Sequence, residues 1–361
     1  MPDEPHAPSA SLDEELEDLP PEVASIAAFA ARLFQTRKVY SRPLELGKEY
    51  RVPGEDAATE KMGRLLAARV AHHIEKGHKQ RRAVHTKLTA LVEGSLRVHD
   101  RIPPELQVGL FARPAHYDLR IRYSNANFII QPDTVGDIRG MAIQVRDVQG
   151  TLLTPENPTQ DFLLITADVL AAKDAVEFLS FTRAQLNGEL PKYFAPRHRR
   201  AWALLAGLSA SAKPPVGETV ADYKYWSAVP FRYGEGRAVK FSVRPRDRRL
   251  GRQASKKTFR EALAERLQSG PVKLDLCVQP QVDPHRMPIE DATVRWSERL
   301  SKPQPVATIR LHKQTLADDM EQLGEAIRFS PWHCLAEHRP LGSLNRARRA
   351  IYQQLQAMRT T

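Results

Sequence analysis

The chain has 361 residues, a formal net charge of +11 and 42% hydrophobic residues. This length can bury a full core in one large domain or two ordinary ones. No apolar run is long enough to span a bilayer, which predicts a soluble globular protein without a transmembrane segment. The two cysteines, Cys277 and Cys334, lie far apart without metal-binding spacing, which argues against a disulfide framework and against a zinc site.

The positive charge raises the question of nucleic-acid binding, because clustered Lys and Arg release counterions from a phosphate backbone. Here the basic residues are scattered, apart from the runs at 79–82 and 244–252. No RNP, helix-turn-helix or zinc-finger pattern accompanies them. Nucleic acid is therefore not an expected partner. A basic nucleic-acid or membrane-surface protein stays as the weakest of three interpretations.

Residues 1–21 are rich in Pro, Asp and Glu, which predicts a disordered acidic tail. They show no charged-then-apolar leader, so a cytoplasmic location is expected. Apolar residues then repeat at helical spacing in 22–35 and in 59–77. Two amphipathic helices are therefore expected near the start of the domain.

Strand-like patterns follow. Residues 81–100 favour a strand that is interrupted at Gly94, and residues 117–124 alternate strictly between apolar and polar side chains. In a curved sheet, the polar face of 117–124 is expected to look into a site and the apolar face to pack on helices. The pattern predicts further strands at 141–145, 162–165, 238–243, 272–278, 293–296 and 306–311, and helices at 174–186, 197–212, 257–268 and 319–327. This order predicts the α+β class, built around an antiparallel sheet or barrel.

The last predicted helix, 345–359, places Arg348, Tyr352 and Arg359 at positions i, i+4 and i+11. At about 100° per residue, these three side chains fall within roughly 40° of one another on one stripe of the helix. An arginine one turn from a tyrosine can stabilise its phenolate, a hard anionic donor suited to ferric iron. Taken alone, the same pattern also fits a basic amphipathic helix in which Tyr352 is packed for bulk.

Five segments resemble, in the same order, the core of haem catalases, and most closely the small bacterial catalase-like haem proteins: RRAVHTK, FARPAHYDLRIRYSNA, DIRGMAI, TQDFLL and RARRAIYQQLQAMR. The resemblance implies a catalase-like antiparallel β-barrel with surrounding helices that enclose a haem pocket. It implies haem b, with its iron, as the cofactor. It also implies that residues 22–361 form one catalase-like haem-binding domain, with N-terminal helices in 22–78, the barrel and its helical inserts in 79–311 and the proximal ligand region in 312–361.

On the distal side, residues 82–85 match the R-x-V-H element of the family. The match implies that His85 is the base that handles peroxide, with Arg82 and Val84 beside the haem. Arg122 and Ser124 match the R-F-S strand, in which the arginine meets a haem propionate and the serine orients the distal histidine. Their i, i+2 spacing places both on the polar face of the strand. Without the resemblance, these residues would read as an ordinary strand histidine, an exposed arginine and an edge hydroxyl.

On the proximal side, Arg348 and Tyr352 match the R-x-x-x-Y of catalases, which implies that Tyr352 is the axial ligand of the haem iron and that Arg348 tunes it. Arg359 falls seven residues after this tyrosine, where the family has a further propionate-binding arginine. Arg82, Arg122 and Arg359 would then clamp the two propionates, a task that suits the bidentate guanidinium better than lysine.

The sequence departs from the family on the distal side. Alignment places Thr166 where catalases carry an asparagine that hydrogen-bonds peroxide, and a threonine hydroxyl is shorter and differently aimed than an amide. Asn157 is the alternative donor if the alignment shifts. Leu170 and Ala171 replace phenylalanines, which predicts a roomier and more apolar pocket. Residues 137–140 resemble the D-P-R-G turn and are interpreted as structural, with the glycine permitting the turn.

Three functions are carried forward from this pattern. The first is a haem-dependent oxidoreductase that acts on hydrogen peroxide or organic hydroperoxides with a small-molecule reductant, more peroxidase-like than a true catalase. The second is a catalase-fold protein that binds or senses haem without catalysis. The third is the basic binding protein described above. No counterpart of the long amino-terminal arm or flavodoxin-like domain of large catalases is recognised, so a homodimer is kept open and extensive tetramer threading is not expected.

Overall fold

The computed structural model describes residues 43–77, 82–193, 219–246 and 258–358. Its strands are β1 (Leu88–Val98), β2 (His116–Asn125), β3 (Arg139–Val145), β4 (Gln160–Ile165), β5 (Tyr225–Trp226), β6 (Phe231–Arg232), β7 (Ala238–Pro245), β8 (Val272–Pro280) and β9 (Gln304–Leu311). They form one antiparallel sheet in the order β5-β4-β3-β2-β1-β9-β8-β7-β6. Because β5 also pairs with β7, eight of these described strands close into a barrel and β6 extends it at one edge.

The barrel is filled from the apolar face of each strand. In β2, Leu119, Ile121 and Tyr123 are fully buried in the main core cluster, together with inward-facing residues of the other strands. The intervening Arg122 and Ser124 are buried on the outer face, between the barrel and the rest of the chain. The alternation expected for 117–124 is thus present, but its apolar face packs inside the barrel and not on helices. A closed barrel requires this, because its interior must be filled by every second residue.

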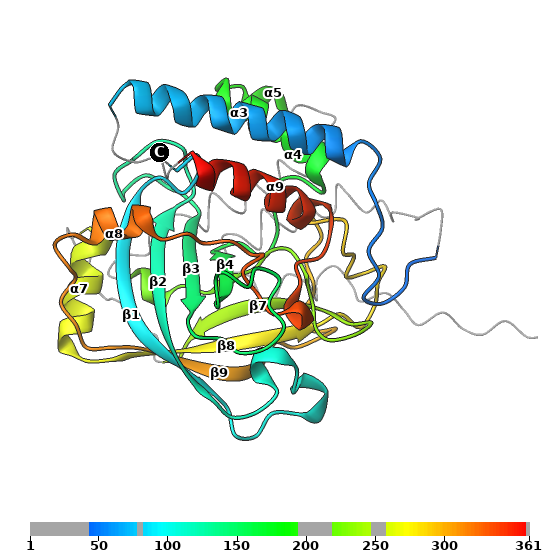
Figure 1. Cartoon of the computed structure of the whole chain (residues 1–361), viewed down its shortest axis with the longest axis vertical. Helices are drawn as coiled ribbons and strands as arrows, with labels where there is room; N and C mark the ends of the chain where they lie inside the picture. Colours follow the sequence, from blue (N-terminus) through cyan, green and yellow to red (C-terminus); the bar gives the residue numbers. More distant parts are fainter. Residues whose placement is uncertain (1–42, 78–81, 194–218, 247–257, 359–361) are drawn as a thin grey trace, which may run out of the picture.

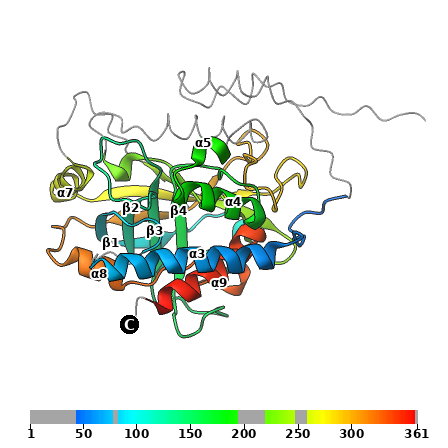
Figure 2. The same cartoon turned by 90° about the horizontal axis from the view of Figure 1, so that it is seen from above.

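The α-helices in the described residues are α3 (Glu55–Glu75), α4 (Ala175–Leu186), α5 (Leu190–Tyr193), α7 (Phe259–Ser269), α8 (Met320–Ala326) and α9 (Ser343–Ala357). Figures 1 and 2 show α3, α4 and α9 stacked over one side of the barrel, with α7 and α8 beside β1. Side-chain caps fix two helix starts: Asp174 accepts from the Glu177 N–H at 2.9 Å, and Thr258 forms a capping box with Glu261. The observed architecture confirms the α+β prediction of a barrel with surrounding helices.

Two predicted features of the sheet differ from the structure. β1 runs unbroken through Gly94, where an added Cβ would lie 2.6 Å from the carbonyl oxygen of Arg310 on β9. This glycine therefore permits close approach of two strands and does not interrupt one. Residues 293–296 do not form a strand: the segment begins in a turn, where the Asp291 carboxylate accepts from both the backbone N–H and the hydroxyl of Thr293, and continues without regular structure.

Several predictions fall on residues outside the described ranges: the acidic tail at 1–21 and the helices at 22–35 and 197–212. The subdivision at 78 and 311 stays a prediction. Within the described ranges, no helix is both long and apolar enough to cross a membrane.

Candidate functional site

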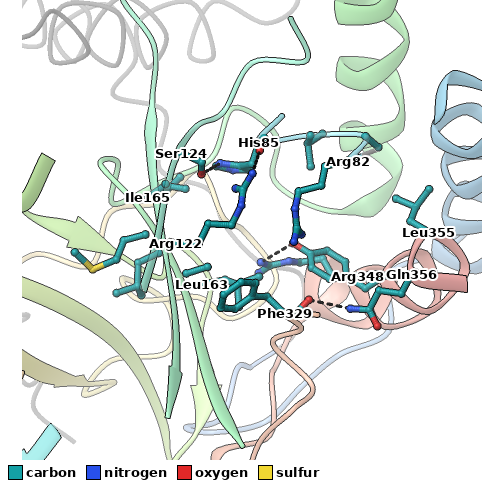
Figure 3. A pocket seen from close by; sticks show the side chains of 17 residues that line it. Arg82, His85, Arg122, Ser124, Leu163, Ile165, Phe329, Arg348, Leu355 and Gln356 are labelled. Carbon is teal, nitrogen blue, oxygen red and sulfur yellow. Dashed lines mark hydrogen bonds between the residues drawn. The ribbon is translucent and has the colours of Figure 1, made fainter. Parts of the chain in front are cut away.

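A cavity lies between the outer face of the barrel and α9. Its empty space amounts to about 790 Å³, including the part that is open to solvent. One wall is formed by residues of the segment before β1 and of β2, β3 and β4, and another by Phe329 and α9 (Figure 3). The lining includes seven of the site residues predicted from the sequence: Arg82, Val84, His85, Arg122, Ser124, Arg348 and Tyr352.

His85 is held by its backbone and by one ring nitrogen. Its φ of 55° is in the left-handed region, which a residue with a side chain rarely adopts. The imidazole Nδ1 lies 3.0 Å from the Ser124 hydroxyl, and the Arg122 guanidinium donates to the His85 carbonyl at 2.9 Å. Within the described part of the chain, Nε2 makes no hydrogen bond. The ring is therefore fixed through Nδ1 and leaves its other nitrogen available to the cavity.

The environment of His85 keeps its imidazole neutral. Burial lowers its pKa, and together with the positive charges of Arg122, Arg348 and Arg82 it brings the pKa to about 3. A neutral imidazole at physiological pH can accept a proton, which is what a general base must do.

Two arginines lie side by side at the cavity and share a carboxylate. Arg82 donates to the carbonyl oxygens of Gly324 and Ile327 at 2.7 and 2.8 Å. Glu325 lies 3.4 Å from the Arg82 Nε and 3.8 Å from the Arg122 Nη2. Burial and the adjacent Arg122 lower the pKa of Arg82 to about 9. This concentration of positive charge is suited to an anionic ligand.

Tyr352 and Arg348 meet on α9 as predicted from their spacing. The Arg348 Nη2 lies 3.4 Å from the Tyr352 phenol oxygen, and its guanidinium carbon lies 5.4 Å from the centre of the phenol ring. The contact is longer than the roughly 2.8 Å of a strong charge-assisted hydrogen bond. Both residues line the cavity, so the phenol is presented to the same space as the His85 imidazole.

Sequence reasoning missed Asn345, which positions Arg348. Its buried side-chain amide donates to the carbonyl oxygens of Pro230 and Leu341 at 3.0 and 2.9 Å, and its Oδ1 accepts from the Arg348 Nη1 at 3.1 Å. The amide thereby anchors Arg348 to the loop next to β6. An asparagine at i−3 from an arginine is too common for this role to be visible in the sequence.

The distal residues expected to differ from catalases are placed as follows. Thr166 does not line the cavity, because its hydroxyl accepts from the backbone N–H of Arg139 at 3.0 Å and so closes the junction of β3 and β4. Asn157, Leu170 and Ala171 do not line it either. Aliphatic side chains that do line the cavity include Ala142, Leu163, Ile165, Val84 and Leu355. A pocket roomier and more apolar than that of catalases stays a prediction.

Arg359, the third arginine of the predicted clamp, lies outside the described residues. Gly140, interpreted from the sequence as a turn residue, lies within β3 on the wall of the cavity. Its φ is not in the left-handed region, so the need for glycine at this position has another cause.

Comparison with solved structures identifies the fold. A bacterial catalase matches with a TM-score of 0.59 and 17% sequence identity, over 90% of this chain and 64% of that one. The chain has a catalase-like fold. A fungal catalase matches with a TM-score of 0.58 and 15% identity over 87% of this chain and 64% of its own length. Catalase A from Saccharomyces cerevisiae matches with a TM-score of 0.59 and 16% identity over 89% of this chain and 68% of its own.

The chain thus spans 64% of the length of the bacterial and the fungal catalase that it matches. No protein-family model matches the sequence, and no curated protein does. At such low identities the likeness establishes the catalase-like fold alone. Any activity has to be argued from the residues of the cavity.

Proposed function

We propose that the cavity binds haem b and that the protein is a haem-dependent oxidoreductase acting on peroxides. The observation that carries this proposal is that a phenol with an adjacent arginine and a neutral histidine line one cavity from different elements. Tyr352 would be the axial ligand of the iron, with Arg348 beside its oxygen. Arg82 and Arg122 would pair with propionates, and the predicted role of Arg359 is part of the same proposal.

The residues of the chain define what they contribute to the reaction. Bound haem would supply the redox-active iron at which the O–O bond of a peroxide is cleaved. With the proton on Nδ1 donated to the Ser124 hydroxyl, the Nε2 of His85 has a lone pair that can take a proton from one peroxide oxygen and return it to the other. Ser124 holds this tautomer and ring orientation. The low pKa of His85 keeps the base ready across the neutral range.

The lining favours peroxidase-like chemistry over efficient disproportionation of hydrogen peroxide. Beside the arginines and Ser124, the lining of the cavity includes aliphatic side chains such as Ala142, Leu163 and Ile165. The lining amide, Gln356, belongs to α9 and donates to the Phe329 carbonyl at 2.9 Å. Loss of one positioned donor commonly costs about 100-fold in rate. We therefore propose organic hydroperoxides alongside hydrogen peroxide as substrates, with a small-molecule reductant.

Haem titration tests the cofactor assignment. Purified protein is titrated with hemin and followed by its Soret absorbance, for the wild type, Tyr352→Phe and His85→Ala. Tyr352→Phe should weaken haem retention, because it removes the ligand oxygen, whereas His85→Ala should retain haem and react more slowly with peroxide. Unchanged haem spectra in Tyr352→Phe would show that the ligand assignment is wrong.

Steady-state kinetics test the substrate assignment. The hemin-loaded protein is compared with hydrogen peroxide and with a bulky alkyl hydroperoxide, using the same reductant. The aliphatic lining predicts a kcat/KM for the bulky substrate at least equal to that for hydrogen peroxide. A clear preference for hydrogen peroxide counts against the assignment.

The same apolar lining supports one alternative, a catalase-fold protein that binds or senses haem without catalysis. Hemin-loaded protein that shows neither turnover nor a spectral change on addition of peroxide would favour it. Salt-sensitive binding to nucleic acid or anionic vesicles, with no Soret band on hemin titration, would instead favour the basic binding protein.

A further inference from the structure

Gly140 lies directly against the predicted base. A Cβ built on Gly140 would be 2.5 Å from the His85 Nδ1, 2.7 Å from its Cε1 and 2.7 Å from the Ser124 Oγ. Real Cβ atoms essentially never approach other atoms this closely. Since its backbone is ordinary strand, the glycine is required by what lies beside it and not by its conformation.

We propose that Gly140 is a positioning residue for His85, whose imidazole rests on the bare backbone of β3. This inference deepens the proposed function, on which its consequence for catalysis rests. The placement of the imidazole against β3 does not itself depend on haem. Any side chain at position 140 would occupy the volume of the ring.

The contacts on both sides of β3 fix the backbone of Gly140 against the His85 imidazole. Gly140 is the direct cross-strand neighbour of Ser124, which explains why one residue can face both the hydroxyl and the ring. On the other side of β3, the Thr166 N–H donates to the Arg139 carbonyl and the Thr166 hydroxyl accepts from the Arg139 N–H, each at 3.0 Å. β3 therefore cannot easily move away from an enlarged residue at position 140.

His85 has little freedom to adapt. Its left-handed backbone is fixed by the Arg122 guanidinium on its carbonyl and by a bond from its N–H to the Ala126 carbonyl at 3.4 Å. A methyl group at position 140 should therefore break the hydrogen bond between the His85 Nδ1 and the Ser124 hydroxyl and displace the ring toward the cavity. There the imidazole would be better hydrated, although Arg82, Arg122 and Arg348 line the same cavity and would still act on it.

The test follows the His85 imidazole by NMR in the full-length protein without haem. The His85 signals are assigned by their loss in His85→Ala, and their pH titration is compared in the wild type and Gly140→Ala. The wild-type ring should stay neutral to below pH 4, whereas in Gly140→Ala the pKa should rise by at least one unit toward the ordinary 6.5. An unchanged titration with an intact Nδ1 hydrogen bond in Gly140→Ala would overturn the proposal.

Gly63→Ala is the matched control. Its added Cβ would also approach a polar atom to 2.5 Å, but this atom is the tip of the exposed Gln354 side chain, which can move. The control should leave the His85 titration unchanged. A shift as large as that in Gly140→Ala would mean that the effect is not local to position 140, and would overturn the proposal.

A double variant covers the case in which Gly140→Ala folds poorly. In His85→Ala the imidazole is absent and the Ser124 hydroxyl can rotate, so the same methyl group should fit. Adding Gly140→Ala should therefore lower the urea midpoint much more in the wild type than in His85→Ala. Equal losses of the urea midpoint in both backgrounds would overturn the proposal.

None of these measurements uses haem. A protein that fails to bind hemin would therefore refute the proposed function and leave this inference unaffected.

Discussion

At the scale of single residues, His85 determines how the reaction should respond to pH. Because burial and the nearby arginines lower the pKa of His85 to about 3, the base is already deprotonated throughout the neutral range. The second-order rate constant for the reaction of hemin-loaded protein with peroxide should stay flat from about pH 5 to pH 8, where an ordinary histidine would titrate. Stopped-flow absorbance at closely spaced pH values measures this, and an inflection near pH 6.5 that disappears in His85→Ala would contradict it.

Asn345 supports the other wall of the cavity. Asn345→Ala removes the acceptor for Arg348 and leaves the carbonyl oxygens of Pro230 and Leu341 without this donor. Each lost buried partner costs about 1–3 kcal/mol, so unfolding free energy should fall by about 3 kcal/mol. Haem should also transfer faster to a scavenger protein. Gln353→Ala, exposed on the same helix, is the control for urea unfolding and haem transfer, and equal losses in both variants would refute the role of Asn345.

At the scale of elements, α9 is anchored through Arg346. Its guanidinium reaches Glu49 at 2.7 Å, Glu55 at 2.8 Å and Glu290 at 3.1 Å. Burial lowers the pKa of Arg346, but Glu55 and Glu290 outweigh this and raise it. The network ties α9 to the start of α3 and to the loop before β9. It thereby fixes the helix that carries Tyr352.

Arg346→Met should therefore be strongly destabilising, because it removes the cation that the three carboxylates share and leaves Glu49 with Arg339 alone and Glu55 with Arg51 alone. Breaking such a partly buried network typically costs about 3–5 kcal/mol. Arg64→Met, which removes an exposed pair with Glu60, should cost less than about 1 kcal/mol. Urea unfolding of the two variants gives the comparison, and similar small losses would show that Arg346 does not anchor α9.

The elements that sequence predicted best are those whose pattern is local. The alternation in 117–124 and the helical spacing in the last helix depend only on residues within each segment, and both elements are present. Gly94 and Gly140 were misinterpreted because each is required by a partner far away in the chain, Arg310 and His85 respectively. A single sequence shows a glycine but not what lies against it.

At the scale of the whole molecule, the resemblance predicted a barrel, but the strand patterns alone did not show how it closes. Closure depends on β5, a strand of two residues that pairs with both β4 and β7.

The candidate site was predicted only in part. The resemblance led to His85 and Tyr352, 267 positions apart (352 − 85), which the fold brings to one cavity. It also led to Thr166, whose hydroxyl is used by the strand junction, since alignment fixes a position in the chain and not the direction of a side chain.

Two buried neutral histidines should make the whole fold sensitive to acid. Burial lowers the pKa values of both His85 and His338 to about 3, and the Nε2 of His338 accepts from the Leu110 N–H at 3.1 Å. Between about pH 3 and 6.5 the unfolded chain binds protons at these sites that the folded chain does not, so stability rises with pH across this window and falls on acidification. From pH 7 to pH 5 each histidine should cost about 2 kcal/mol of unfolding free energy.

The loss of unfolding free energy from pH 7 to pH 5 should therefore be about 2 kcal/mol smaller in His85→Gln than in the wild type. Carboxylates that titrate in this range contribute equally to both proteins and cancel in the comparison. Urea unfolding at pH 7 and pH 5 measures the difference. His99→Gln, at a part-buried histidine that bonds the Thr308 hydroxyl, is the control and should keep the full wild-type loss. If the loss in His85→Gln equalled that of the wild type, the pKa of His85 would not be lowered in the folded protein, and the flat pH dependence predicted above would also be wrong.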